Sequence, residues 1–419
     1  MTVVVLGAGV IGVTTAWYLR AQGHDVRVVD RQPGAALETS FANAGQVSAH
    51  LAEPWSNPQT PRMLPKWLLD EDAPLVFRPR ARWDQWRWLA KFLAECRPDR
   101  YARNLVHLAN IGLYSRNALK ALRAQTGVVY DNHQGGLLLF HTSTAQYERA
   151  AATARRLASA GLQRTVKTRD ECIAIEPALH AIRDRLAGGI YSELDETGDA
   201  HQFTQALARA CEARGVAFDF GTTIRRIVVD GDQVSGVDVE HADGERETLR
   251  AASYVACLGC YTPALLKPLG IGLDIYPVKG YSVTIPVADP NAAFRIGITD
   301  AAHKIAFSRL GDRLRATSTA EVADFDRTID VRRCKALVTH TDNLFPGSGH
   351  GDRATFWAGL RPTTPGNLPY VGRSRISNLY VNAGHGTVGW TQSCGSGKAL
   401  AEILGGRRPE VDFPFYGVR

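Results

Sequence analysis

Three glycines near the start of the chain, in Gly7-Ala-Gly9-Val-Ile-Gly12, have the spacing of a dinucleotide-binding turn. Such a turn lets the backbone approach a pyrophosphate, and the helix that follows presents free N–H groups to the phosphates. Asp30 lies 18 residues beyond Gly12, at the end of the next expected strand, where a carboxylate accepts hydrogen bonds from a ribose. The pattern predicts dinucleotide binding, without separating FAD from NAD.

Two further segments have the composition of loops that pass close to a cofactor. The first is Glu38-Thr-Ser-Phe-Ala-Asn-Ala-Gly-Gln46, in which small hydroxyl and amide side chains flank Gly45. The second is Asn382-Ala-Gly-His-Gly-Thr-Val-Gly-Trp390, which precedes a helix that contains Gly395 and Gly397. In the second, nearby N–H groups would stabilise the negative charge that a reduced flavin develops. The alternative is a glycine-rich loop with an ordinary helix cap.

Strands and helices alternate at both ends of the chain and must position these loops. The expected elements are strands over 3–6, 26–29, 216–220 and 254–258, helices over 10–22, 145–161, 202–215 and 395–404, and strand-like segments over 135–141, 224–251, 276–285 and 304–319. We therefore expect an α/β fold with a Rossmann-type FAD-binding domain assembled from non-contiguous segments. This domain would comprise 1–50, 195–270 and 355–419. An α+β substrate-binding domain with an antiparallel sheet would comprise 51–194 and 271–354.

The composition is that of a globular protein, with 45% hydrophobic and 22% charged residues. No apolar run approaches the roughly 20 residues that cross a bilayer, and Met1-Thr2 lacks the basic start of a signal peptide. We therefore expect a cytoplasmic protein. A net charge of +7 is too mild to argue for nucleic acid, but it suits anionic substrates or an anionic membrane surface.

The seven cysteines are scattered and odd in number, unlike a disulfide framework. Cys257-Leu-Gly-Cys260 is a C-x-x-C motif, but the sequence has no second such pair to complete a four-cysteine metal site. We expect reduced thiols and no metal centre.

Residues 55–97 are rich in tryptophan and basic side chains. Five of the eight tryptophans fall within 34 residues. These tryptophans and their basic neighbours are Trp55, Trp67, Trp83, Trp86, Trp88, Arg78, Arg80, Arg82, Arg87, Lys91 and Arg97. Indole rings beside cations favour a lipid headgroup interface, which predicts peripheral contact with the inner face of the cytoplasmic membrane. The alternative is a helix that packs its tryptophans on the substrate domain and leaves the arginines in water.

Six segments together carry a family resemblance: VVVLGAGVIGVTTAWYL, ETSFANAGQVS, DETGDAHQFT, YPVKGYS, WAGLRPTTPGNLPYVG and NLYVNAGHGTVGWTQSCGSGKAL. They span essentially the whole chain. With them the chain resembles the small-subunit family of D-amino acid dehydrogenases, within the superfamily of D-amino acid oxidase, glycine oxidase and sarcosine oxidase. The resemblance implies non-covalent FAD and oxidation of a D-amino acid to a 2-oxo acid and ammonia, by hydride transfer to flavin N5. It also implies that electrons pass to a quinone or another respiratory acceptor.

The resemblance implies a set of residues that contact FAD. They are Gly7, Gly9, Val10, Ile11, Gly12, Asp30, Arg31, Thr39, Ser40, Asn43, Ala44, Gly45, Ile224, Gly259, Gly384, Gly386, Thr387, Val388 and Gly389.

Four further residues are candidates for the substrate site. The resemblance implies that Arg361, in Gly359-Leu-Arg-Pro362, pairs with the substrate carboxylate, a role that suits a planar guanidinium. The alternative is a surface arginine before a proline turn. Tyr281 is a candidate donor to the same carboxylate or simply a strand residue, and His385 lies inside the expected flavin loop. His50 is a candidate contact to substrate or flavin, with an ordinary hydrogen-bonded histidine as the alternative.

One departure from the family and three other functions stay open at this point. The segment Arg315-Ala-Thr-Ser-Thr-Ala-Glu321 has no glycine where family members usually carry one before Ala-Glu, which leaves the pocket shape there undetermined. The alternatives are an enzyme for a cyclic or N-methylated amino acid such as D-hydroxyproline or sarcosine, an electron-transfer flavoprotein without a substrate, and a NAD-dependent dehydrogenase. The last would leave the loop 382–390 unexplained.

Overall fold

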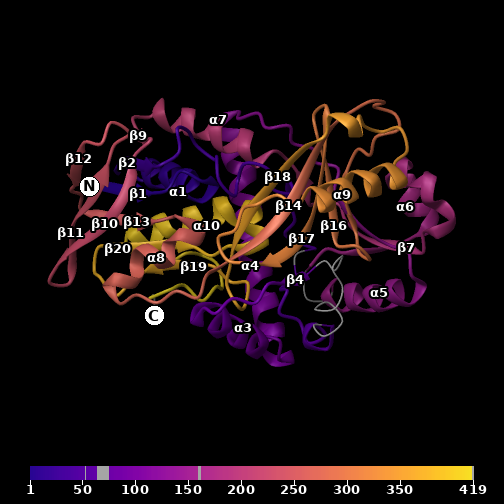
Figure 1. Ribbon diagram of the computed structural model, residues 1–419, viewed down its shortest axis with the longest axis horizontal. Helices are drawn as coiled ribbons and strands as arrows, with labels where there is room; N and C mark the ends of the chain where they lie inside the picture. Colours follow the sequence, from indigo (N-terminus) through magenta and orange to yellow (C-terminus); the bar gives the residue numbers. More distant parts are fainter. Residues whose placement is uncertain (52, 64–74, 159–161, 418–419) are drawn as a thin grey trace.

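A sheet assembled from distant segments of the chain carries the glycine turn (Figure 1). The computed structural model describes residues 1–51, 53–63, 75–158 and 162–417. The sheet has six strands in the order β19–β20–β13–β1–β2–β9, and all its neighbours are parallel except β19 and β20. Its strands are β1 (Thr2–Leu6), β2 (Asp25–Asp30), β9 (Ala217–Phe220), β13 (Ser253–Ala256), β19 (Tyr370–Arg373) and β20 (Leu379–Ala383).

The central strand β1 is apolar on both faces because both faces are covered. Val3 and Val5 pack with helices α1 (Val10–Ala21), α7 (Ala200–Glu212) and α10 (Gly389–Leu404). Val4 and Leu6 face the other way, toward a three-stranded antiparallel sheet and α8 (Thr262–Leu266). The strands of that smaller sheet are β10 (Thr223–Asp230), β11 (Gln233–Glu240) and β12 (Arg246–Leu249). This arrangement confirms the expected α/β fold of Rossmann type.

A second, nine-stranded sheet lies beside the first (Figure 1). Its order is β18–β14–β17–β16–β15–β5–β7–β6, with β4 paired to β17, and most neighbours are antiparallel. Its strands are β4 (Leu75–Phe77), β5 (Leu137–His141), β6 (Thr165–Thr168), β7 (Gly188–Ser192), β14 (Tyr276–Pro286), β15 (Gly297–Asp300), β16 (Ile305–Leu310), β17 (Arg313–Val322) and β18 (Thr355–Thr363). Around it lie α5 (Thr144–Ala158), α6 (Arg169–Ile175) and α9 (Val331–Leu344). A two-stranded ribbon of β3 (Gln46–Val47) and β8 (Glu196–Thr197) completes the sheets.

Helix α10 begins at Gly389, six residues before the predicted start at 395. Gly395 and Gly397 therefore lie inside the helix, away from the glycine-rich loop. A Cβ on Gly395 would sit 2.6 Å from Cα of Ser115 in α4 (Pro98–Thr126), and one on Gly397 would sit 2.9 Å from the backbone of Thr14 in α1. These two glycines let α10 pack closely against two neighbouring helices.

Two elements lie across the domain boundaries expected from the sequence. Strand β18 starts at residue 355, yet it pairs with β14 in the nine-stranded sheet. Helix α4 falls inside the expected substrate segment, yet its buried Ile111 and Leu119 pack in the cluster around β1 and α1. We keep the division into two domains as a proposal, with these two elements placed by their packing.

All seven cysteines are buried and unpaired, in line with the expected reduced thiols. Burial raises the pKa of the Cys257 thiol to about 12, which keeps this thiol protonated. Among the described residues, no helix combines the length and the apolar character required to cross a membrane.

Candidate functional site

One cavity of about 1360 Å³ runs from the glycine turn to the nine-stranded sheet. Apart from Gly12, Gly45 and Gly384, all the residues expected to contact FAD line this cavity. Of the four candidates for the substrate site, Arg361, Tyr281 and His385 line it. The fold thus gathers residues from the two ends and the middle of the sequence around one space.

At one end of the cavity the backbone leaves room for a diphosphate. Gly7 has φ +107°, a conformation that favours glycine. A Cβ on Gly12 would lie 1.8 Å from the carbonyl oxygen of Gly7, so this glycine closes the turn rather than lining the cavity. The first turn of α1 has no acidic side chain to repel phosphates.

Asp30 holds the end of this turn in place. One carboxylate oxygen accepts from the backbone N–H of Ala8 at 2.7 Å, and the other accepts from Gln32 at 2.8 Å. Burial raises the pKa of Asp30, although these two hydrogen bonds oppose the shift. Each oxygen keeps acceptor capacity, which suits the hydroxyl groups of a ribose.

The loop 38–46 is tied both to the glycine turn and to the nine-stranded sheet. Ser40 Oγ accepts from the N–H of Val10 at 3.2 Å, at the start of α1. Thr39 donates its hydroxyl to the carbonyl of Leu360 at 2.7 Å, next to Arg361 on β18. The position of the cofactor loop therefore depends on the strand that carries Arg361.

The loop 382–390 supplies polar groups that have no partner within the described residues. Asn382 Oδ1 and Trp390 Nε1 are buried, unmatched by any hydrogen bond there, and on residues that line the cavity. Such orphaned groups are costly unless a ligand satisfies them. His385 is buried with Nε2 3.0 Å from Ser396 Oγ, and burial lowers its pKa to about 3, so its imidazole is neutral. Glycine turn, Asp30 and these groups together fit a dinucleotide that ends in a flat ring.

Arg361 lies on the wall of the cavity that belongs to the nine-stranded sheet. Its Nη1 donates to the carbonyl oxygens of Thr319, at 2.8 Å, and Lys279, at 3.3 Å. The guanidinium carbon lies 5.8 Å from the ring centre of Trp55. Within the described chain no carboxylate forms an ion pair with Arg361, and burial lowers its pKa to about 10, so it is still cationic at neutral pH. This cation therefore lines the cavity and keeps N–H donors for a ligand, since both of these hydrogen bonds come from Nη1.

A β-bulge between β14 and β17 produces the two carbonyls that hold Arg361. The pairing shifts between Lys279↔Glu321 and Tyr281↔Ser318. Thr319, inside the bulge, has φ +67°, which is rare and strained for a β-branched residue. Thr319 therefore adopts a conformation that glycine reaches more easily, in the segment where the resemblance led us to expect a glycine.

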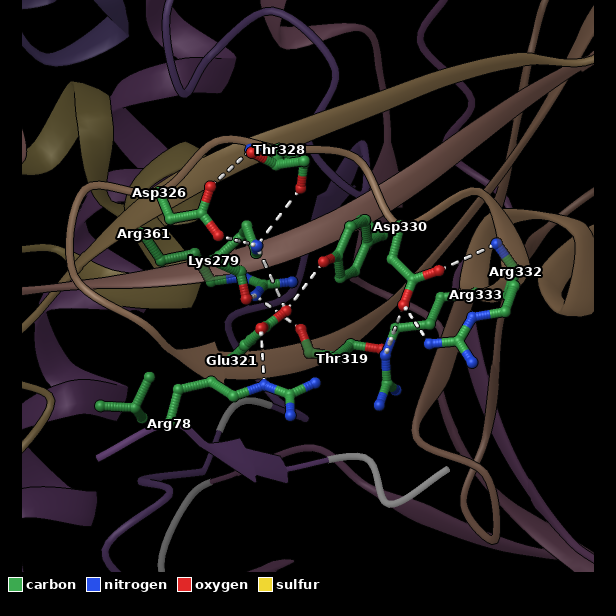
Figure 2. Close-up of polar contacts among 12 residues, drawn as sticks. Arg78, Lys279, Thr319, Glu321, Asp326, Thr328, Asp330, Arg332, Arg333 and Arg361 are labelled. Atoms are coloured by element: carbon green, nitrogen blue, oxygen red, sulfur yellow. Dashed lines mark hydrogen bonds and ion pairs between the residues drawn. The ribbon is translucent and has the colours of Figure 1, made fainter. Parts of the chain in front are cut away.

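Behind Arg361, the buried carboxylate of Glu321 is the centre of a charge cluster that extends to the surface at Arg78 (Figure 2). Its Oε2 lies 3.4 Å from Nζ of Lys279, which also contacts Asp326 at 3.1 Å. Its Oε1 lies 3.3 Å from Nε of Arg78, the residue that follows β4. Because Lys279 and Glu321 flank the bulge, this cluster pins the backbone that positions Arg361.

Tyr281 belongs to the same cluster. Its hydroxyl donates to Glu321 Oε2 at 2.8 Å, and burial raises the pKa of Tyr281. The ring of Tyr281 lines the cavity, but its proton is directed at Glu321. This geometry therefore does not support the prediction that Tyr281 donates to a substrate carboxylate. The sequence could not reveal Glu321 as the acceptor, because the two residues lie 40 positions apart.

His50 lies outside the residues that form the cavity wall in the described chain. Its Nδ1 accepts from the N–H of Gln163 at 3.1 Å, and its Nε2 lies 3.5 Å from Arg116. Desolvation and the nearby cations lower the pKa of His50 to about 4. The alternative interpretation, an ordinary hydrogen-bonded histidine, describes it better than contact with substrate or flavin.

Several cavity residues were missed as site residues. Trp55, Trp86, Trp88 and Phe92 line the cavity, which places the tryptophan-rich segment in its wall. Trp357 and Lys304 also line it. The signal was present in the clustering of tryptophans, but no local pattern showed which of them line the cavity and which, like Trp83, lie at the surface. Trp67 lies outside the described residues.

The strain at Thr319 leads to a prediction. We expect Thr319→Gly to raise the free energy of unfolding by about 1 kcal/mol, because glycine adopts the left-handed conformation without a steric cost. Thr319→Ala is the matched control, since it removes the hydroxyl and methyl but keeps the Cβ, and it should give no such gain. Chemical denaturation of the wild type and the two variants measures the free energy of unfolding. Equal stability of the glycine and alanine variants would contradict it.

Comparisons with known proteins identify the family of the chain. Residues 2–403 match the family described as "FAD dependent oxidoreductase". A D-amino acid dehydrogenase of Dechloromonas aromatica (strain RCB) is 49% identical, with 99% of both chains covered. Among solved structures, glycine oxidase from Geobacillus kaustophilus has a TM-score of 0.75 at 22% identity (98% of this chain, 96% of that one), and L-proline dehydrogenase from P. horikoshii has 0.76 at 14% (98% and 95%). These two show the shared fold. The chain is an enzyme of the FAD-dependent oxidoreductase family, and FAD is the cofactor that the glycine turn and the loop 382–390 anticipated.

Proposed function

We propose that the protein oxidises D-amino acids to 2-oxo acids and ammonia. The observation that carries this proposal is Arg361, a cation on the cavity wall with no carboxylate partner within the described chain. A planar guanidinium with unused donors is suited to grip a carboxylate through two parallel hydrogen bonds. The 49% identity to a D-amino acid dehydrogenase over the full length supports the D-amino acid as the owner of that carboxylate.

The residues that line the cavity divide into those that would hold FAD and those that would face the substrate. We propose FAD contacts for the predicted cofactor residues along the wall, with Gly12, Gly45 and Gly384 acting through backbone conformation. Arg361 would fix the substrate carboxylate, while Trp55 and Trp357 would shape the space for the rest of the molecule.

When bound, FAD supplies the oxidant and accepts a hydride. The protein's own contribution is orientation and exclusion of water, because a fixed carboxylate directs the Cα–H of the substrate. The neutral imidazole of His385 avoids placing a second cation beside the substrate amine. With the substrate amine neutral, no side chain is needed as a dedicated base at this step, since the nitrogen lone pair forms the C=N bond as the hydride leaves Cα. Water then hydrolyses the imine to the 2-oxo acid and ammonia.

Arg361 argues against one of the alternative functions but not against the other. An electron-transfer flavoprotein without a substrate has no use for an unpaired guanidinium inside its cavity, since leaving a cation desolvated costs free energy. A cyclic or N-methylated amino acid would also present a carboxylate to Arg361, so the test must compare substrates directly.

The substrate class is tested by anaerobic addition of amino acids to the FAD-loaded protein, followed by absorption. We expect D-alanine to bleach the flavin band and L-alanine to leave it unchanged. Sarcosine and D-hydroxyproline serve as the competing substrates. Bleaching by one of these, with none by any D-amino acid that carries a primary amine, would contradict the proposed reaction.

Arg361 is tested by substitution. We expect Arg361→Gln to reduce kcat/KM for D-alanine by about 10²- to 10³-fold, mostly through KM, because charge-assisted hydrogen bonds to the carboxylate are lost. The kcat/KM of Arg361→Lys should lie between those of the wild type and Arg361→Gln, since lysine keeps the charge but loses the two parallel hydrogen bonds of a guanidinium. FAD content should not change. The exposed Arg353→Gln is the control, and an unchanged KM in Arg361→Gln would remove the assigned role.

We also propose that electrons pass to a membrane quinone. Helix α3 (Trp83–Glu95) has Trp88 and Phe92 at the cavity, while Trp83 is 78% exposed and Trp86 44% exposed. The helix therefore joins the cavity to an aromatic surface of the kind that settles at a headgroup interface. The basic side chains of the helix contribute less positive charge to this surface than the sequence indicated, because Arg87 and Lys91 both form ion pairs with Asp274.

This acceptor proposal predicts a selective defect. Trp83→Ser should weaken binding to anionic vesicles about tenfold and lower the reduction of vesicle-embedded ubiquinone. Activity with a soluble dye should stay unchanged. Val129, which is also 78% exposed, gives the matched control Val129→Ser. Equal quinone reduction by both variants would argue against docking through α3.

A further inference from the structure

Three potential metal ligands converge where β15 ends. Asp300 is the last residue of β15, His303 lies in the turn before β16, and His340 lies on α9. Asp300 Oδ2 is 2.8 Å from Nδ1 of His303 and 3.0 Å from Nε2 of His340. All three ligand atoms lie within 4.8 Å of one another.

No lysine or arginine among the described residues forms an ion pair with the carboxylate of this group. The residue Asp300 is 1% exposed, and among the described residues its ion-pair partners are the two histidines alone. Backbone N–H groups and the two imidazoles already contact this carboxylate through hydrogen bonds. A divalent cation at the same point would add the direct charge pairing that no lysine or arginine among the described residues supplies. Two imidazoles and a carboxylate are donors that Zn²⁺ and similar divalent transition metals accept.

We propose that Asp300, His303 and His340 bind a divalent transition metal ion such as Zn²⁺. Three protein ligands leave a fourth position for water, the arrangement of an open rather than a closed zinc site. The site contains no residue of the FAD-binding or substrate wall, and it is therefore a second site of the chain.

The backbone already orients the ligands. Asp300 Oδ1 accepts from the N–H groups of Ala302 and His303 at 2.9 and 3.2 Å, so Oδ2 is left to face the two rings. The neighbours of His340 on α9, Leu337 and Thr341, are buried and hold the helix in place.

Binding requires a small adjustment. Tetrahedral ligands about 2.0 Å from zinc lie about 3.3 Å apart, slightly more than the 2.8 and 3.0 Å that separate Asp300 Oδ2 from the two imidazole nitrogens. The His303 side chain is 57% exposed on its turn and is free of the core, so it is the ligand that would move outward.

The site adjoins the substrate cavity through one turn. Thr299, Lys304 and Ala306, on either side of the turn, line the cavity. A metal ion bound by Asp300, His303 and His340 would tie this turn to α9 and so restrain part of the cavity wall. The sequence led us to expect no metal centre, since cysteines were the only ligands arranged in a motif and the fold alone brings His340 to Asp300.

The test is calorimetric titration of ZnCl₂ into FAD-loaded protein from which metal has been removed by a chelator. We expect one saturable ion per chain and a rise of about 2–4 °C in the melting temperature with excess Zn²⁺. His303→Ala and His340→Ala should each weaken binding at least about tenfold. The exposed His180→Ala is the control and should bind as the wild type does.

His303→Ala also guards against a folding artefact, because its side chain is 57% exposed and the variant should remain folded, although less stable, at the temperature of the titration, which circular dichroism checks. Loss of binding in a variant that is shown to be folded would support the site. No saturable binding by the wild type, or equal binding by the wild type and both histidine variants, would overturn it.

Discussion

The site depends on keeping a guanidinium charged on the partly buried wall of the cavity. Moving a cation from water to a protein interior is unfavourable unless oxygen atoms replace its hydration. Arg361 receives two carbonyls from the bulge between β14 and β17 and the face of Trp55. These groups orient the cation without neutralising it, since no carboxylate pairs with it in the described chain. The positive charge of Arg361 would be neutralised by an anion that enters the cavity.

The need to orient Arg361 without neutralising its charge explains why strained and charged residues lie behind it. Thr319 holds a left-handed backbone conformation so that its carbonyl can reach the guanidinium. Lys279 and Glu321 form a buried pair on either side of the bulge (Figure 2). Buried ion pairs contribute little net stability, because desolvation offsets most of their attraction. Their value here is geometric, since they fix two strands in the register that aims Arg361 at the cavity.

The two sheets divide the work at this cavity. The six-stranded sheet presents a glycine turn and Asp30 at the carboxyl ends of its parallel strands, the usual place for a nucleotide. The nine-stranded sheet presents Arg361 from a long antiparallel strand. The hydrogen bond from Thr39 to Leu360 links the two, because the loop 38–46 thereby touches both the helix α1 region and β18.

Sequence reasoning was strongest where chemistry resides in a short local pattern. The glycine turn, Asp30 and the loop 382–390 are contiguous motifs, and the described structure brings them to one cavity. Reasoning failed where partners come from distant segments. Tyr281 is directed at Glu321, His50 at Gln163 and Arg116, and Asp300 at His340, and no spacing rule connects these pairs. Gly395 and Gly397 were expected in a helix, as found, but their role in packing α10 on α4 and α1 depends on the assembled fold.

The most direct test of the account is a crystal structure of the FAD-loaded protein with 2-aminoisobutyrate. This amino acid keeps the amine and the carboxylate but has no hydrogen on Cα, so it binds without being oxidised. The account predicts that both carboxylate oxygens lie within hydrogen-bond distance of the Arg361 guanidinium. Meanwhile Nη1 should keep its contacts with the carbonyls of Thr319 and Lys279. A carboxylate bound elsewhere in the cavity, with Arg361 unliganded, would contradict the central claim.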